Sequence, residues 1–160
     1  MLTFAASLEI LAIVIWAGGL TVLGLLVAPA LFKLASSRTE AGRIFGALLK
    51  RFQPVAYACG AAILLAGALR WLGGYRALAA ELVRYVIVVL MLGMTAYAGF
   101  VLTPKIEKLR AEIANAPKAD ARRERFTSAH KLATTLLIFQ VLLGLALAVL
   151  VAMQLTNGFI

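Results

Sequence analysis

The chain has 160 residues, of which 63% are hydrophobic and 14% charged, and its formal net charge is +9 at pH 7. These values exclude an ordinary soluble domain, because the apolar residues form runs that can cross a bilayer, which takes about 20 residues. The charge does not indicate nucleic-acid binding, since no folded basic domain is left once these runs are set aside. We therefore expect a single domain, residues 1–160, with no nucleic-acid partner.

The first apolar run covers Leu8–Ala35 and is longer than a bilayer requires. As a helix it would extend about 42 Å at 1.5 Å per residue, against a hydrocarbon core of about 30 Å. We expect it to tilt, bend or project. Pro29 removes a backbone donor and predicts a kink in this run.

The segment Arg38–Gln53 is not expected to span. Its apolar residues recur at helical spacing and charged residues fill most of the remaining positions. This pattern predicts a separate amphipathic helix in the plane of the cytoplasmic headgroups. Its apolar face comprises Ala41, Ile44, Phe45, Leu48, Leu49 and Phe52.

Three further apolar runs follow, at Pro54–Leu72, Leu82–Thr103 and Ala129–Leu155. Pro54 is a good first-turn residue for the second span. Together the runs predict an all-α integral membrane protein, a four-transmembrane-helix bundle with the cytoplasmic amphipathic helix between helices 1 and 2. Residues after Pro104 predict a charged helical hairpin that breaks at Asn115-Ala116-Pro117.

The basic residues are distributed unevenly along the chain. Thirteen of the sixteen Lys and Arg residues lie in or beside the first and third links between the apolar runs. Positive links remain in the cytoplasm, so we expect a multi-pass protein of a bacterial-type cytoplasmic (inner) membrane with both termini outside. The same cations predict attraction to anionic lipid headgroups.

Glu9 is the only acidic residue inside an apolar run. Arg70 and Arg84 stand at the outer ends of their spans, at the depth expected for Glu9. A charge within a membrane span is costly and marks a candidate functional site. Two interpretations stay open, a structural ion pair of Glu9 with one of the arginines and a ligand, proton or substrate site.

His130, the only histidine, begins the fourth span. Its chemistry suits a proton carrier or metal ligand, but a polar cap bonded to a neighbouring helix explains it as well. Met91, Met94 and Cys59 offer soft sulfur, which suits Cu(I). Methionine also fills gaps in apolar cores, so we predict no metal site.

Other features predict packing and anchoring. Small residues recur every fourth position, which predicts ridges for close helix packing; they are Ala58, Ala62 and Ala66, and Gly144, Ala148 and Ala152. Trp16 and Trp71 are expected to anchor the spans at the membrane interfaces. No nucleophile–base pair, phosphate loop or carboxylate pair is present, which disfavours an enzyme.

Several short motifs along nearly the whole chain resemble the small four-span family that includes eukaryotic transmembrane protein 205. They are Trp16-Ala17-Gly18-Gly19, Ala28-Pro29-Ala30-Leu31-Phe32, Ala41-Gly42-Arg43-Ile44-Phe45-Gly46, Thr103-Pro104, and Phe126 with His130. The resemblance implies four helices and membrane residence, and eukaryotic members are linked to tolerance of metal-containing drugs. His130, Pro29 and Gly18-Gly19 match the family pattern, whereas the scarcity of sulfur pairs argues against a metal role here.

The Trp16-Ala17-Gly18-Gly19 turn also resembles that of copper-resistance proteins of the D type and haem-containing protoporphyrinogen oxidases of the J type. Members of both often carry a histidine two helical turns before the tryptophan, where this chain has Glu9. Because glutamate is a poor ligand for haem iron, this departure argues against a haem enzyme. We predict no cofactor, neither haem nor copper.

These observations favour a non-catalytic accessory or subunit role in a larger membrane complex. The partner is then another membrane protein or a second copy of this chain. The alternative is an oligomeric carrier or exporter of a small solute or metal ion that uses Glu9 or His130, and a haem- or copper-linked protein ranks third.

Overall fold

The computed structural model describes residues 2–74, 79–113 and 121–156. Within these ranges the chain forms helices, with short turns at residues 35–37 and 73–74, and no strand. The elements are α1 (Leu2–Val22), η1 (Leu23–Val27), α2 (Ala28–Leu34), α3 (Arg38–Leu72), α4 (Ala79–Tyr97), η2 (Ala98–Leu102), α5 (Thr103–Ile113) and α6 (Ala121–Thr156), with η1 and η2 π-helical. The predicted break at Asn115-Ala116-Pro117 lies outside the described residues.

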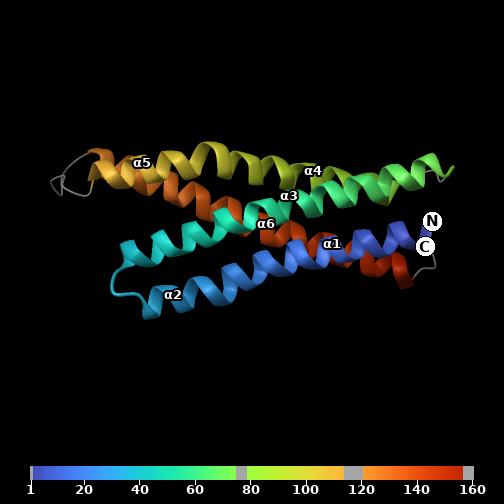
Figure 1. Ribbon diagram of the computed structural model, residues 1–160, viewed down its shortest axis with the longest axis horizontal. Helices are drawn as coiled ribbons and strands as arrows, with labels where there is room; N and C mark the ends of the chain where they lie inside the picture. The colour runs from blue at the N-terminus through green and yellow to red at the C-terminus, as the bar shows by residue number, and fades with distance from the viewer. Residues whose placement is uncertain (1, 75–78, 114–120, 157–160) are drawn as a thin grey trace.

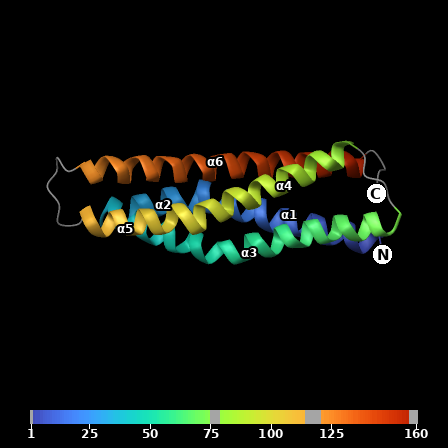
Figure 2. The ribbon, with the colours of Figure 1, turned by 90° about the horizontal axis from the view of Figure 1, so that it is seen from above.

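The helices form four long rods that lie along a common axis (Figures 1 and 2). Each rod is long and apolar enough to cross a membrane, at Phe4–Leu34, Arg38–Leu72, Leu82–Ile113 and Ala121–Met153. α1 packs against α3 and α6, and α4 packs against the same two helices from the opposite side. The protein is therefore a multi-pass helical bundle, as the apolar runs predicted.

The second rod differs from the prediction of a separate surface helix. α3 is one continuous helix from Arg38 to Leu72, with Pro54 in its interior rather than at its start. Ser37 caps it by accepting a hydrogen bond from the Glu40 N–H at 3.1 Å. The helix runs through Pro54 because proline removes only one backbone hydrogen bond, and neighbouring helices compensate for such losses in membrane bundles.

Each of the first and third rods contains a five-residue π-helical segment, and each segment ends two residues before a proline. The Ala28 N–H donates to the Leu23 carbonyl, and the Thr103 N–H to the Ala98 carbonyl. The widened turns accommodate Pro29 and Pro104, whose rings crowd the preceding turn. The kink predicted at Pro29 is thus a local change from α-helix to π-helix, and the same change occurs before Pro104.

The core lies in the middle of the bundle, between all four rods. Its most deeply buried apolar side chains include Trp16, Ile63, Met91 and Leu147. Trp16 is only 1% exposed, so the prediction that it anchors a membrane interface is wrong, whereas Trp71 is 72% exposed near the end of α3. Trp16 is buried because it falls on the same face of α1 as Ala12, Ile13 and Leu20.

Most of the described basic residues collect at one end of the bundle, whereas Arg70 and Arg84 lie near the other. At the basic end α2 packs on the start of α3, and α5 packs on the start of α6. We name this the hairpin end; it lies on the left in Figure 1, opposite the start of α1 and the end of α6. The described Lys and Arg residues there are Lys33, Arg38, Arg43, Lys50, Arg51, Lys105, Lys108, Arg110, Arg122, Arg123, Arg125 and Lys131.

Candidate functional site

The candidate site is an ionic triad buried near the other end of the bundle. Glu9 on α1, Arg70 on α3 and Arg84 on α4 are 1%, 9% and 3% exposed. α1 brings Glu9 inward because it shares a face with Ala5, Ala12 and Trp16, at helical spacing. The only acid of the first apolar run therefore faces the bundle interior rather than lipid.

Glu9 contacts both arginines, one with each carboxylate oxygen. Arg70 Nη2 forms a salt bridge with Glu9 Oε2, and Arg84 Nη1 lies 3.3 Å from Glu9 Oε1. Both contacts are ionic, between oppositely charged atoms. The sequence predicted a contact with one arginine; the carboxylate instead joins three rods at one point.

Tyr85 completes the surroundings of the triad. The Arg84 guanidinium carbon lies 5.8 Å from the centre of the Tyr85 ring. That ring packs directly on the backbone of α3, because a Cβ at Gly67 would lie 2.6 Å from Tyr85 Cζ. Gly67 thus allows the α3–α4 approach that brings the two guanidinium groups to the same carboxylate.

The chemistry of this arrangement is that of a fixed ion pair in a medium of low dielectric. Removing one partner of a buried pair leaves an uncompensated charge and typically costs about 3–5 kcal/mol. The triad therefore locks three rods together, and it is also the single described place where a carboxylate is held inside the bundle. The structural ion pair and the ligand, proton or substrate site, which were the two interpretations from sequence, therefore concern the same carboxylate.

A second buried polar group lies deeper, between α4 and α6. Gln140 Nε2 donates to Thr95 Oγ1 at 2.8 Å and to the Met91 carbonyl at 3.2 Å. Thr95 Oγ1 in turn donates to the Met91 carbonyl at 2.9 Å. Gln140 of α6 thus bonds to α4. Thr95 was missed, because a threonine within an apolar run gives no sign of its partner.

Comparison with known proteins gives one result. A family model described as a domain of unknown function (DUF4149) matches residues 11–115, which is more than half of the chain. The chain belongs to the DUF4149 family. No curated protein and no solved structure is found to match it.

The DUF4149 match includes Arg70 and Arg84 and begins two residues after Glu9. It covers most of the first rod and all of the second and third, and it ends before α6, which carries Gln140 and His130. The family description therefore fits a small membrane family without assigned activity. The triad has to be interpreted from its own geometry.

His130 does not join the triad. It lies on α6 at the hairpin end, is exposed, and stacks on Phe126 one turn earlier, with ring centres 6.1 Å apart. Its backbone carbonyl accepts a hydrogen bond from Thr134 of the same helix. Glu9 and His130 are thus at opposite ends of the bundle and do not form one site.

Two of the sulfur-bearing residues lie in the core, whereas Met94 is only partly buried. Cys59 and Met91 both belong to the central apolar cluster, and Cys59 is a free thiol. Within residues 2–74, 79–113 and 121–156, no three His, Cys, Asp or Glu side chains gather in a way that could hold a metal ion.

Proposed function

We propose that this DUF4149 protein is a non-catalytic accessory subunit that packs against a larger membrane protein in a bacterial-type cytoplasmic membrane. In this proposal the hairpin end lies in the cytoplasm and the triad end outside. The concentration of basic residues at the hairpin end supports that direction, because positive segments are retained in the cytoplasm. The resemblance to the family of transmembrane protein 205 belongs to the same proposal.

The observation that carries the proposal is that only a small part of each membrane span is buried against the other spans of the chain. Only 22% to 33% of the most apolar window of each span is buried within the protein. Ala148 and Ala152, which continue the small-residue ridge from buried Gly144, are exposed on α6. Small residues on a membrane-facing surface let another helix approach closely, so this face suits a protein neighbour.

The buried polar groups support a structural role for the interior. Glu9 is engaged by Arg70 and Arg84, and Gln140 by Thr95 and Met91. These groups bind each other across the rods and so hold the bundle together. A carrier of polar solutes would instead need such groups arranged along a path through it.

A tagged copy of the chain, purified from its native membranes in mild detergent after photo-crosslinking from position 152 on the same exposed ridge, tests the proposal. We expect a stoichiometric membrane protein to co-purify. Ala148→Leu should reduce its recovery, whereas Ala68→Leu, at an exposed position on α3, should not. Recovery of the chain alone would refute the accessory role.

The second candidate is an oligomeric carrier or exporter of a small solute or metal ion. The observation that favours it is a carboxylate held inside a membrane-spanning bundle, which is a functional position by default. Four spans make a thin pathway, so this role requires several copies. Crosslinks between two copies of this chain, with no other protein, would favour it.

A further inference from the structure

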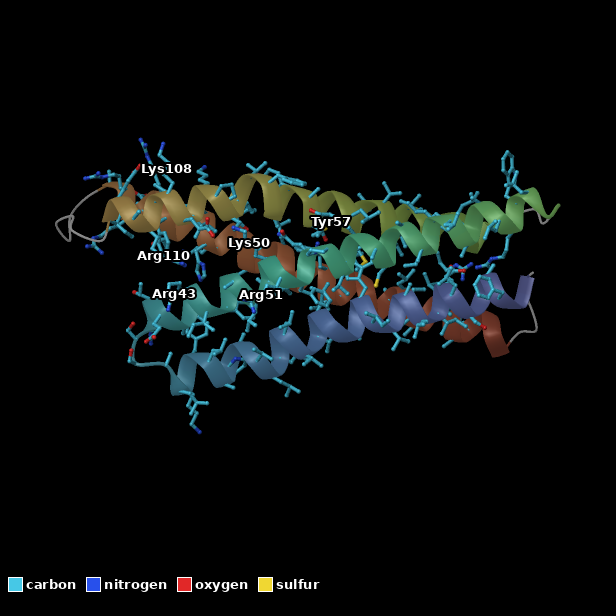
Figure 3. The ribbon with its side chains drawn as sticks, in the orientation of Figure 1. Arg43, Lys50, Arg51, Tyr57, Lys108 and Arg110 are labelled. Atoms are coloured by element: carbon cyan, nitrogen blue, oxygen red, sulfur yellow. The ribbon has the colours of Figure 1, made fainter. Side chains whose placement is uncertain are left out.

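A row of cationic side chains lies between the first half of α3 and α5 at the hairpin end. Arg43 and Lys50 are seven residues apart on α3, about two helical turns, and so share a face. Figure 3 shows Lys50 and Arg110 between the two helices, whereas Lys108 stands on the far side of α5. We name the surface formed by Arg43, Gly46, Lys50, Glu107 and Arg110 the basic seam.

Long side chains, rather than close helix packing, join the two helices along this seam. The ionic contact across it joins Lys50 Nζ and Glu107 Oε1 at 3.8 Å, between side chains that are 63% and 57% exposed. An exposed pair of this kind contributes little to stability. A Cβ at Gly46 would meet no atom within 4 Å, so there is open space beside the cations. Three cations thus line the seam against one carboxylate.

Arg110 provides an independent sign that an anion belongs here. Its Nε is buried and has no hydrogen-bond partner. The guanidinium is held in position by the Phe126 ring, whose centre is 5.8 Å from Arg110 Cζ, and by the bare backbone of Gly42. A buried donor without an acceptor is costly, and a guanidinium fork matches the oxygens of a phosphate.

The depth of the seam indicates where that phosphate comes from. Lys50 precedes Arg70 by twenty residues of the same helix, which is about 30 Å and equals the thickness of the hydrocarbon core. With the triad at one membrane surface, Lys50 therefore falls at the other, among the headgroups.

The wall below the seam is apolar and carries one free hydroxyl. Tyr57 lies one further heptad along the same face of α3, with its ring stacked on Phe100 at a centre distance of 6.4 Å. Its hydroxyl is buried without a hydrogen-bond partner. Phe100 is 75% exposed, so its ring offers an apolar surface to an acyl chain.

We propose that the basic seam binds the headgroup phosphate of an anionic phospholipid, with Arg110, Lys50 and Arg43 as its cationic partners. This proposal goes beyond the general attraction of basic loops to the membrane. It names a single binding site, and the open space beside Gly46 limits what can bind there. It rests on the proposed membrane placement of the bundle, and it does not depend on the accessory role.

Native mass spectrometry of the full chain in neutral detergent, titrated with phosphatidylglycerol or phosphatidylcholine, tests the charge of the site. We expect phosphatidylglycerol to bind about tenfold more tightly than phosphatidylcholine. Arg110→Gln should abolish this preference, since charge-assisted hydrogen bonds are the strong ones. Lys108→Gln removes one cation from the outer side of the same helix and should leave the preference unchanged. An equal loss in both variants would overturn the proposal, because it would show a diffuse charge effect.

The space beside Gly46 provides a test that leaves every charge in place. Gly46→Leu fills the seam and should abolish the selective binding, while leucine favours the helix over glycine. Gly93→Leu is the matched control, because Gly93 is exposed on α4 and a Cβ there also meets nothing within 4 Å. Unchanged lipid binding by Gly46→Leu would overturn the proposal.

Competition distinguishes a lipid phosphate from a soluble one. Millimolar inorganic phosphate or glycerol 3-phosphate should not displace phosphatidylglycerol, because neither reaches the apolar wall at Tyr57. Full displacement by either compound would overturn the assignment to a lipid. Retained lipid selectivity in a chain that recovers no protein partner would refute the accessory role and leave this site standing.

Discussion

Gly144 of α6 lies directly against Ala17 of α1. A Cβ built at Gly144 would be 2.9 Å from the Ala17 Cβ and 3.3 Å from its Cα. An added Cβ would therefore meet the Cβ and the backbone Cα of Ala17, and neither atom can rotate away. This contact sets the distance between the first and last rods at the level of the core.

Gly144→Ala is expected to destabilise the bundle, because the added methyl group must push α6 away from α1. Overpacking of this kind costs about 1–3 kcal/mol. Gly93→Ala serves as the control, since it adds the same methyl group to open space on α4 and should stabilise the helix by about 0.5–1 kcal/mol. Unfolding in mixed detergent–SDS micelles, followed by circular dichroism, measures both free energies. Stabilisation of the bundle by Gly144→Ala, as expected for the control, would contradict the contact.

The sequence predicted Gly144 as a packing residue because small residues recur every fourth position there. It did not show which members of the ridge are covered: Gly144 is buried, whereas Ala148 and Ala152 are exposed. Spacing identifies a face of a helix, but the crossing of two rods decides where along that face they touch. The burial of Trp16 was missed for the same reason.

Gln140→Leu and Thr95→Val are expected to interact in a double-mutant cycle. Their side chains share a hydrogen bond of 2.8 Å inside the bundle, and such bonds in membrane proteins couple by about 0.6 kcal/mol on average and about 1.7 at most. Thr134→Val and Gln140→Leu form the control cycle, because Thr134 bonds only its own helix at an exposed position. The same unfolding measurement gives both coupling energies. Additive effects for the first pair would show that the bond contributes nothing.

The candidate site was partly predictable. Glu9, Arg70 and Arg84 were brought together from sequence because each stands near an end of an apolar run, and run ends on one membrane side share a depth. The engagement of both arginines was not predictable, since it depends on how Tyr85 packs on the bare backbone at Gly67. The continuity of α3 was missed because proline at a helix start and proline inside a helix look alike in sequence.

A reporter fused to the C-terminus is expected to behave as periplasmic. Most basic residues of the described rods gather at the hairpin end, opposite the end of α6, and positive segments remain in the cytoplasm. Alkaline phosphatase and a fluorescent protein, each active on only one side, measure the orientation. A fusion placed after Ser37 provides the control and should report the cytoplasm. Reversed signals would place the triad end inside.

Glu9→Gln is expected to lower the free energy of unfolding by about 3–5 kcal/mol, because it leaves two buried guanidinium groups without their carboxylate. Glu107→Gln removes an acid from an exposed pair and should cost less than about 1 kcal/mol. Replacing the whole triad together, as Glu9→Leu, Arg70→Leu and Arg84→Met, should recover much of the loss, since an apolar cluster of similar volume needs no partner charge. Recovery in the triple variant, with partner binding retained, would identify the triad as structural. A stable Glu9→Gln protein that has lost partner binding or transport would instead make the carboxylate the functional group, and the fixed ion pair between the rods would not be its role.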